Sequence, residues 1–89
     1  IKIMKKELNI VVIKIADRIK EAGLVQKTLS DYNEIIKTRF GFHELSTEVC
    51  SRQALIILEL AGELEQEKKL VSELNQIGGI KTEVMNFEL

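Results

Sequence analysis

The stretches LNIVVIKI (residues 8–15) and ALIILEL (residues 54–60) carry aliphatic side chains at both odd and even positions. Successive side chains of a β-strand point to opposite faces of its sheet, so strands of this kind need cover on both faces. The chain has only two amphipathic helical stretches, which is enough to cover one face of a small sheet. We therefore expect the other face to be covered by another polypeptide, most simply by a second copy of this chain.

The segments around these two stretches complete a β-α-β-β-α-β order. Hydrophobic spacing predicts strands over residues 7–15, 34–42, 53–61 and 80–87, and helices over residues 18–32 and 63–77. This is the order of the ferredoxin-like α+β fold, in which a four-stranded antiparallel sheet carries two helices on one face. Its first and third strands are central, and these are the two stretches without a polar face. The alternative is a swapped or fused dimer of the same unit.

The remaining strands fit the two edges of such a sheet. They carry charges that discourage unwanted pairing, namely Lys37, Arg39, Lys81 and Glu83. Alternation along residues 34–42 predicts one side made of Ile36, Thr38, Phe40 and Phe42, and an opposite side made of Ile35, Lys37, Arg39 and Gly41.

Each helix is predicted to pack an apolar stripe on the sheet. The first stripe consists of Ile19, Ala22, Val25, Leu29 and Tyr32, and the second of Leu64, Leu70, Val71, Leu74 and Ile77. Close packing of the first helix would explain its internal Gly23, and Gly78-Gly79 would end the second helix in a left-handed turn. We expect a solvated helix surface for the carboxylates Glu63, Glu65, Glu67 and Glu73.

Length and charge exclude several classes of protein. A chain of 89 residues allows one domain, which we take as residues 1–89. Met4 is a candidate for the native start, in which case residues 1–3 would be foreign sequence. The net charge of −1 argues against direct nucleic-acid binding and electrostatic membrane attachment by this domain. No apolar run approaches the ~20 residues of a spanning helix. With one cysteine and no signal-peptide pattern, we expect a cytoplasmic protein.

The residues that most often carry chemistry are sparse. His43 is the single histidine and Cys50 the single cysteine, and a metal site needs three or four ligands. A metal site shared between subunits is one interpretation of this pair, and two unremarkable loop residues are the other. No nucleophile, phosphate-binding or dinucleotide-binding motif is present. We therefore predict no enzyme activity, no cofactor and no metal.

Four residues are candidates for a ligand-binding cleft. Asp17 and Arg18 stand at the turn from the first strand to the first helix, where backbone amides can bind an anion. Asp17 as a helix cap is the competing interpretation. On the second strand, Arg39 can bind a carboxylate or phosphate, and Gly41 allows close backbone approach; the competing interpretation is an exposed edge arginine and a bulge glycine.

Several segments together carry a resemblance to a known family. They are Ile10-Val11-Val12-Ile13 running into Ala16-Asp17-Arg18, then Ile35–Gly41, Ala54–Leu58, and the ending Leu74–Thr82. In them the chain resembles the small ACT-like proteins described as regulators of iron-only hydrogenase systems. That family carries an Ile-Ile-x-x-Arg-x-Gly type signature, which matches Ile35-Ile36-Lys37-Thr38-Arg39-Phe40-Gly41.

The resemblance implies an ACT-type ferredoxin-like fold, a regulatory role, and dimers or tetramers like those of the C-terminal domains of nickel-responsive regulators. The chain departs from the family pattern at Phe42-His43, where a proline is common, and at Ser72-Glu73-Leu74-Asn75, where the family has Gly-Lys-Leu-Gly. The metal-binding histidines of nickel regulators have no counterparts here, so nickel sensing is not carried over.

Together these observations predict a homo-oligomeric ACT-like regulatory domain that assembles through its sheet face and edges. It would bind a small effector or a partner protein at a subunit interface, in a transcriptional-regulation setting. One alternative is a structural or adaptor module without a small ligand. Another is a small enzyme of the dimeric ferredoxin-like type, which His43 on a predicted loop disfavours.

Overall fold

The computed structural model describes residues 7–42 and 52–89, so the predictions for Met4, His43 and Cys50 lie outside the described residues. Its strands and helices follow the predicted order closely. The elements are β1 (Glu7–Ile15), α1 (Arg18–Asp31), a 3₁₀ turn (Asn33–Ile35), β2 (Ile36–Phe42), β3 (Ala54–Leu60), α2 (Leu64–Asn75) and β4 (Ile80–Glu88).

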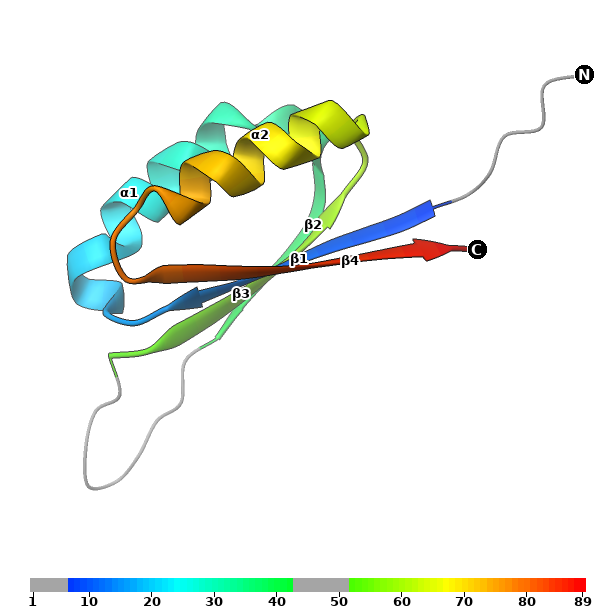
Figure 1. The fold of residues 1–89 in the computed structure, drawn as a ribbon. Helices are drawn as coiled ribbons and strands as arrows, with labels where there is room; N and C mark the ends of the chain where they lie inside the picture. The colour runs from blue at the N-terminus through cyan, green and yellow to red at the C-terminus, as the bar shows by residue number, and fades with distance from the viewer. Residues whose placement is uncertain (1–6, 43–51) are drawn as a thin grey trace, which may run out of the picture.

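The four strands form one antiparallel sheet in the order β2-β3-β1-β4. Both helices lie on the same face of this sheet (Figure 1). The central position of β1 and β3 confirms the ferredoxin-like prediction. Their pairing places Val11 opposite Leu58 and Val12 opposite Ile57, so the β1–β3 pairs at the centre of the sheet are aliphatic on both faces.

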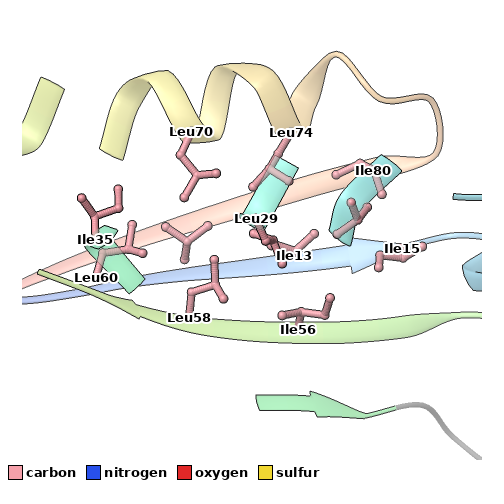
Figure 2. Close-up of a cluster of buried hydrophobic side chains, with 12 residues drawn as sticks. Ile13, Ile15, Leu29, Ile35, Ile56, Leu58, Leu60, Leu70, Leu74 and Ile80 are labelled. Carbon is pink, nitrogen blue, oxygen red and sulfur yellow. The ribbon is translucent and has the colours of Figure 1, made fainter. Parts of the chain in front are cut away.

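The hydrophobic core lies between the helices and the sheet. Figure 2 shows side chains from β1 and β3 pointing toward those of α2. The residues of the core, all at most 8% exposed, are Val11, Ile13, Ile15, Val25, Leu29, Ile35, Ile56, Leu58, Leu60, Leu70, Leu74 and Ile80. From Val11 to Ile15 and from Ile56 to Leu60, every second residue enters this core, as the period of a strand requires.

The second helix is closed at both ends by local contacts. At its start, the Glu63 backbone N–H donates to Gln66 Oε1 at 3.0 Å. Beyond its end, the Ile80 N–H donates to the Ile77 carbonyl at 3.3 Å, and Gly79 adopts a left-handed φ of 78° inside this turn. Glycine adopts that conformation without the steric penalty of a side chain, so the predicted left-handed turn is confirmed.

The predicted alternation along the second strand is wrong at Ile36. A register shift between Ile36 and Thr38 places Ile36 opposite Leu60 and Thr38 opposite Glu59. Because one extra residue is inserted, Ile36 joins the helix-facing side and packs against the core, whereas Thr38 and Phe40 face the other way. Strict alternation in the sequence cannot reveal a bulge of this kind.

The predicted helix stripes are wrong at one residue each. Ile19 is 65% exposed and Leu64 is 57% exposed, whereas Glu21 and Glu67 are buried. The prediction of a solvated Glu67 is therefore also wrong. Its carboxylate oxygens accept from Asn86 Nδ2 of β4 at 3.3 and 3.4 Å, which supplies a polar partner on the sheet for a carboxylate that would otherwise be costly to bury.

The sheet face away from the helices has no cover from the described part of the chain. Cross-strand pairing assigns to this open face Leu8, Ile10, Val12, Lys14, Thr38, Phe40, Leu55, Ile57, Glu59, Lys81, Glu83, Met85 and Phe87. Phe40, Met85 and Phe87 are 63%, 43% and 49% exposed. An aromatic and aliphatic surface of this extent is typical of an interaction surface.

Two glycines differ in what surrounds them. A Cβ added to Gly23 would meet no atom within 4 Å, so the predicted close packing of α1 at this residue is wrong. A Cβ added to Gly62 would lie 2.5 Å from Ile35 Cγ2 and 2.9 Å from Ile35 Cβ. Because Ile35 belongs to the buried core, this contact cannot be relieved cheaply.

We expect Gly23→Ala to raise the free energy of unfolding by about 0.5–1 kcal/mol, because alanine is the better helix former and the site is open. Gly62→Ala is the matched control and should lower it by about 1–3 kcal/mol through overpacking. Urea denaturation of both variants measures these changes. An equal effect of the two substitutions would contradict the packing described for Gly62.

Candidate functional site

A cavity of about 180 Å³ opens between α1 and the β2–β3 side of the sheet. Its polar lining consists of Arg18 and Gln26 from α1 and Arg39 from β2, with Gly41 beside Arg39 on the same strand. Arg18 and Gln26 are eight residues apart, so they lie along one line of the helix surface with Ala22 between them. The remaining wall is apolar and comprises Ile15, Ala22, Ala54, Leu55 and Ile56.

The pairing of β2 with β3 determines why Arg39 and Gly41 belong to this cavity. Arg39 lies opposite Leu58 and Gly41 opposite Ile56, and both partners face the helices. A Cβ added to Gly41 would meet Ile56 Cγ1 at 3.9 Å, an ordinary contact. The backbone therefore tolerates a side chain at this position, and the absence of one leaves space in the cavity.

The cavity has a positive lining. Neither aspartate nor glutamate occurs among the described residues that form its wall. Within the same part of the chain, the Arg39 guanidinium has no carboxylate at salt-bridge distance. A guanidinium offers planar, paired N–H donors that match a carboxylate or phosphate, so this arrangement is suited to an anionic group.

A second cavity, of about 240 Å³, shares Arg39 and lies farther along α1. Its other polar residues are Ser30, Asn33, Lys37 and Thr38. Lys37 Nζ lies 3.6 Å from Glu59 Oε2, and Thr38 Oγ1 is 3.1 Å from Glu59 Oε1. The ammonium and hydroxyl groups here already have a carboxylate partner, so this cavity is the weaker anion site.

Asp17 lies outside the cavity and caps α1. Its Oδ1 accepts from the backbone N–H groups of Ile19 and Lys20 at 3.1 and 3.2 Å, and its Oδ2 accepts from Arg52 Nη1 at 3.2 Å. The Arg18 N–H donates to the Arg52 carbonyl at 2.6 Å. Because these amides are engaged within the protein, the structure supports the capping interpretation of Asp17 over an anion site on the helix N-terminus.

The structure thus brings together Arg18, Arg39 and Gly41 of the four predicted residues, and adds Gln26. Gln26 was missed by the sequence reasoning, although its spacing from Arg18 was a usable signal. Arg52 was also missed, because its role depends on tertiary structure: the segment just before β3 lies beside the N-terminal cap of α1.

A cluster of acidic residues lines a different cavity of the protein. A cavity of about 520 Å³ near the start of α2 is lined by Glu7, Glu63 and Glu88 together with Asn9 and Asn86.

In residues 7–42 and 52–89, no three histidine, cysteine, aspartate or glutamate side chains are placed to hold a metal ion. None of the helices in these ranges is long and apolar enough to cross a membrane.

The fold of this chain is similar to the folds of several proteins of known structure. The fold resembles that of the uncharacterized protein TM1266 from Thermotoga maritima, with 26% identity, 94% of this chain and 99% of that chain covered, and a TM-score of 0.79. It also resembles CPII, a nitrogen regulatory PII-like protein from Thiomonas intermedia, bound to ADP, AMP and bicarbonate, with 12% identity, 97% and 93% coverage, and a TM-score of 0.67.

The same fold recurs inside an enzyme. A formyltetrahydrofolate deformylase from Pseudomonas putida matches 88% of this chain over 28% of its own length, with 12% identity and a TM-score of 0.55. No protein-family model and no curated protein sequence matches the chain. Membership of the hydrogenase-regulator group therefore stays a prediction, whereas the ferredoxin-like fold shared with PII-like proteins is established.

The Asp17 cap should make stability depend on pH. Burial raises the pKa of the Asp17 carboxyl, but the hydrogen bonds from Lys20, Arg52 and Ile19, with the charge of Arg52, outweigh it and hold this pKa below its ordinary value. Because this pKa is lower in the folded than in the unfolded chain, the ionised Asp17 carboxylate contributes to the free energy of unfolding at pH above the unfolded-chain pKa of about 3.9. That contribution is lost as the pH falls through the folded-state pKa.

We therefore expect Asp17→Asn to lower the free energy of unfolding at neutral pH and to have little effect at the acid end of the titration, because asparagine retains the cap but not the charge. Urea denaturation at both pH values measures the difference. An equally large effect at both would show that the charge of Asp17 contributes nothing.

Proposed function

We propose that this chain is a homo-oligomeric regulatory domain that binds a small effector in the cavity between α1 and the β2–β3 side of the sheet. The observation that carries the proposal is the convergence of Arg18 and Arg39, which come from different elements, on one cavity with a positive lining. The comparison with CPII supports it, since that protein has this fold and is bound to ADP, AMP and bicarbonate.

The proposed mechanism couples the effector to assembly. Leu55 lines the cavity and also belongs to the open face, where it lies opposite Lys14. A partner that covers the open face would therefore contact a residue of the cavity wall. A ligand that binds one arrangement of this wall more tightly would stabilise the corresponding assembly, and assembly would raise its affinity in return.

A second copy of the chain is the proposed cover of the open face. Four strands about 4.8 Å apart and seven to nine residues long span roughly 450 Å² in projection. Two such faces approach the ~1,000 Å² that a specific interface needs. The charged side chains balance in sign, with Lys14 and Lys81 against Glu59 and Glu83. A face with equal numbers of both signs can complement itself.

The proposal also covers catalysis, the route to any role in transcription, and the cellular location of the domain. The cavity wall contains no histidine, cysteine or carboxylate among the described residues, which favours binding over catalysis. With a net charge of −1, a role in transcription would act through another protein rather than through direct contact with DNA. We place the domain in the cytoplasm.

A structural or adaptor module is the second candidate function. It is favoured by the exposed apolar side chains Phe40, Met85 and Phe87, which a protein partner could cover without any small ligand. Both candidates predict an oligomer or a complex, and they differ in whether the cavity with Arg39 binds a small molecule.

Phe40→Glu should lower the oligomeric mass of the protein, because it would bury a charge without a partner in the proposed interface. Native mass spectrometry with light scattering measures the mass. Leu24→Glu is the matched control: Leu24 is 55% exposed on α1, away from the open face, and its replacement should leave the mass unchanged. A wild-type monomer would contradict the proposed assembly.

Arg39→Ala should keep the fold and weaken effector binding by about tenfold or more, since it removes a charge-assisted hydrogen-bond donor. Amide NMR titrations with bicarbonate, acetate, AMP and ADP measure binding. Lys37→Ala is the control, because Lys37 pairs with Glu59 and does not line the cavity with Arg18. An absence of binding by all four probes would favour the adaptor function instead.

A further inference from the structure

We propose that a second copy of the chain covers the open face in one defined orientation, in which Lys14 of each chain lies over Glu59 of the partner subunit. This inference rests on the proposed function, since it specifies the contact through which that assembly would form. Three observations carry it: the apolar centre of the open face, the diagonal placement of two opposite charges around that centre, and the angle at which twisted sheets pack.

The centre of the open face is formed by Val12 and Ile57, which lie opposite each other on β1 and β3. Both are only partly buried, and both point away from the core because the alternate residues Val11 and Leu58 enter it. Protein interfaces keep charged residues out of their buried centre and place them around it, as this face does. We therefore place the two-fold axis of the dimer at this central pair.

Lys14 and Glu59 lie diagonally across the central pair. Lys14 is opposite Leu55, one row of the sheet to one side of the centre, and Glu59 is opposite Ile10, one row to the other side. The two charges thus share a face, stand on neighbouring strands and have opposite signs. A two-fold axis that exchanges their positions brings each charge over its opposite, and it does so twice in one dimer.

The dimensions of a β-sheet allow this exchange. With strands about 4.8 Å apart and residues of one face about 6.8 Å apart along a strand, the line from Lys14 to Glu59 is inclined to the strands by about 20°. A two-fold axis perpendicular to this line makes the strands of the two sheets cross at about 40°, close to the roughly 30° at which twisted sheets pack face to face. The orientation that matches the charges is therefore also one that two such sheets adopt.

An axis parallel to the strands is the other simple choice through the same centre. It would place Lys14 over Leu55 of the partner subunit, and Glu59 over Ile10 of the partner subunit. Each charge would then lose water against an aliphatic side chain and gain no partner of opposite sign. The diagonal orientation avoids this cost, so it is the favoured one.

Both charged side chains also have neighbours within their own chain. Lys14 lies opposite Lys81 of β4, and like charges directly opposite each other destabilise a sheet, so a carboxylate above them would reduce the repulsion. Glu59 already contacts Lys37 at 3.6 Å and Thr38 at 3.1 Å. A carboxylate has about four acceptor positions, so Glu59 can accept a further ammonium group from above.

Exchanging the charges tests the orientation. Lys14→Glu alone and Glu59→Lys alone should each weaken dimerisation by about a hundredfold, because each dimer would contain two like-charged contacts that cost about tenfold each. An equimolar mixture of the two variants should recover dimerisation as a heterodimer, since both of its contacts again join opposite charges. Native mass spectrometry with one variant isotopically labelled identifies that heterodimer, and analytical ultracentrifugation measures its affinity.

Two further variants serve as controls. Lys81→Glu makes the same charge change on the same face, beside Lys14 but off the diagonal, and should weaken dimerisation far less than Lys14→Glu. The double variant Lys14→Glu/Glu59→Lys loses the contact of Glu59 with Lys37 just as Glu59→Lys does, yet it should dimerise like the wild type. Thermal unfolding of each variant checks that the fold is intact.

The outcomes separate this inference from the proposed assembly. A wild-type dimer whose affinity is unchanged in Lys14→Glu and Glu59→Lys would overturn the orientation and leave the assembly in place. The same conclusion would follow from a folded double variant that stays monomeric, or from an equal loss of affinity in Lys81→Glu. A wild-type monomer would overturn both the inference and the proposed assembly.

Discussion

The structure is organised by the apolar side chains that β1 and β3 present on both faces of the sheet. Within the chain, α1 and α2 cover one face, and the residues on that side, such as Ile13 and Leu58, form the core. The other face keeps Val12 and Ile57 side by side at its centre. A small domain has little apolar burial to spare, so an uncovered aliphatic sheet lowers its stability and raises its tendency to associate. The proposed assembly answers this constraint and also brings a partner to the wall of the cavity.

The order of the strands and most of their boundaries could be predicted because they depend on local periodicity and on the two-sided aliphatic runs. The predicted start of the second strand at residue 34 is wrong, since Asn33–Ile35 form a 3₁₀ turn and β2 begins at Ile36. The other incorrect predictions concern features that depend on tertiary contacts. The bulge at Ile36 inserts a residue that strict alternation cannot show, and the burial of Glu67 depends on Asn86, nineteen residues away in sequence. Ile19 and Leu64 show that the rotation of a helix about its axis depends on what the sheet offers it.

The candidate site was predictable in part for a similar reason. Arg39 and Gly41 were singled out by their residue types on a strand, and Arg18 by its place at a helix start, but no spacing in the sequence places these elements together. Their convergence follows from the packing of α1 beside β2 and β3. The sequence predicts Asp17 in the same cleft, but its two local N–H partners and Arg52 hold it as a helix cap.

The amide of Asn86 has a consequence for the alignment of the sheet. It donates to Asn9 Oδ1 at 2.7 Å and to the buried carboxylate of Glu67, so it links β4, β1 and α2. A slip of β4 by one residue would turn Asn86 to the opposite face and leave Glu67 buried without this partner. Edge strands are prone to such slippage when their pattern is weak, and β4 is largely exposed. Asn86 therefore acts as a register pin, which allows an exposed edge strand to keep a single alignment.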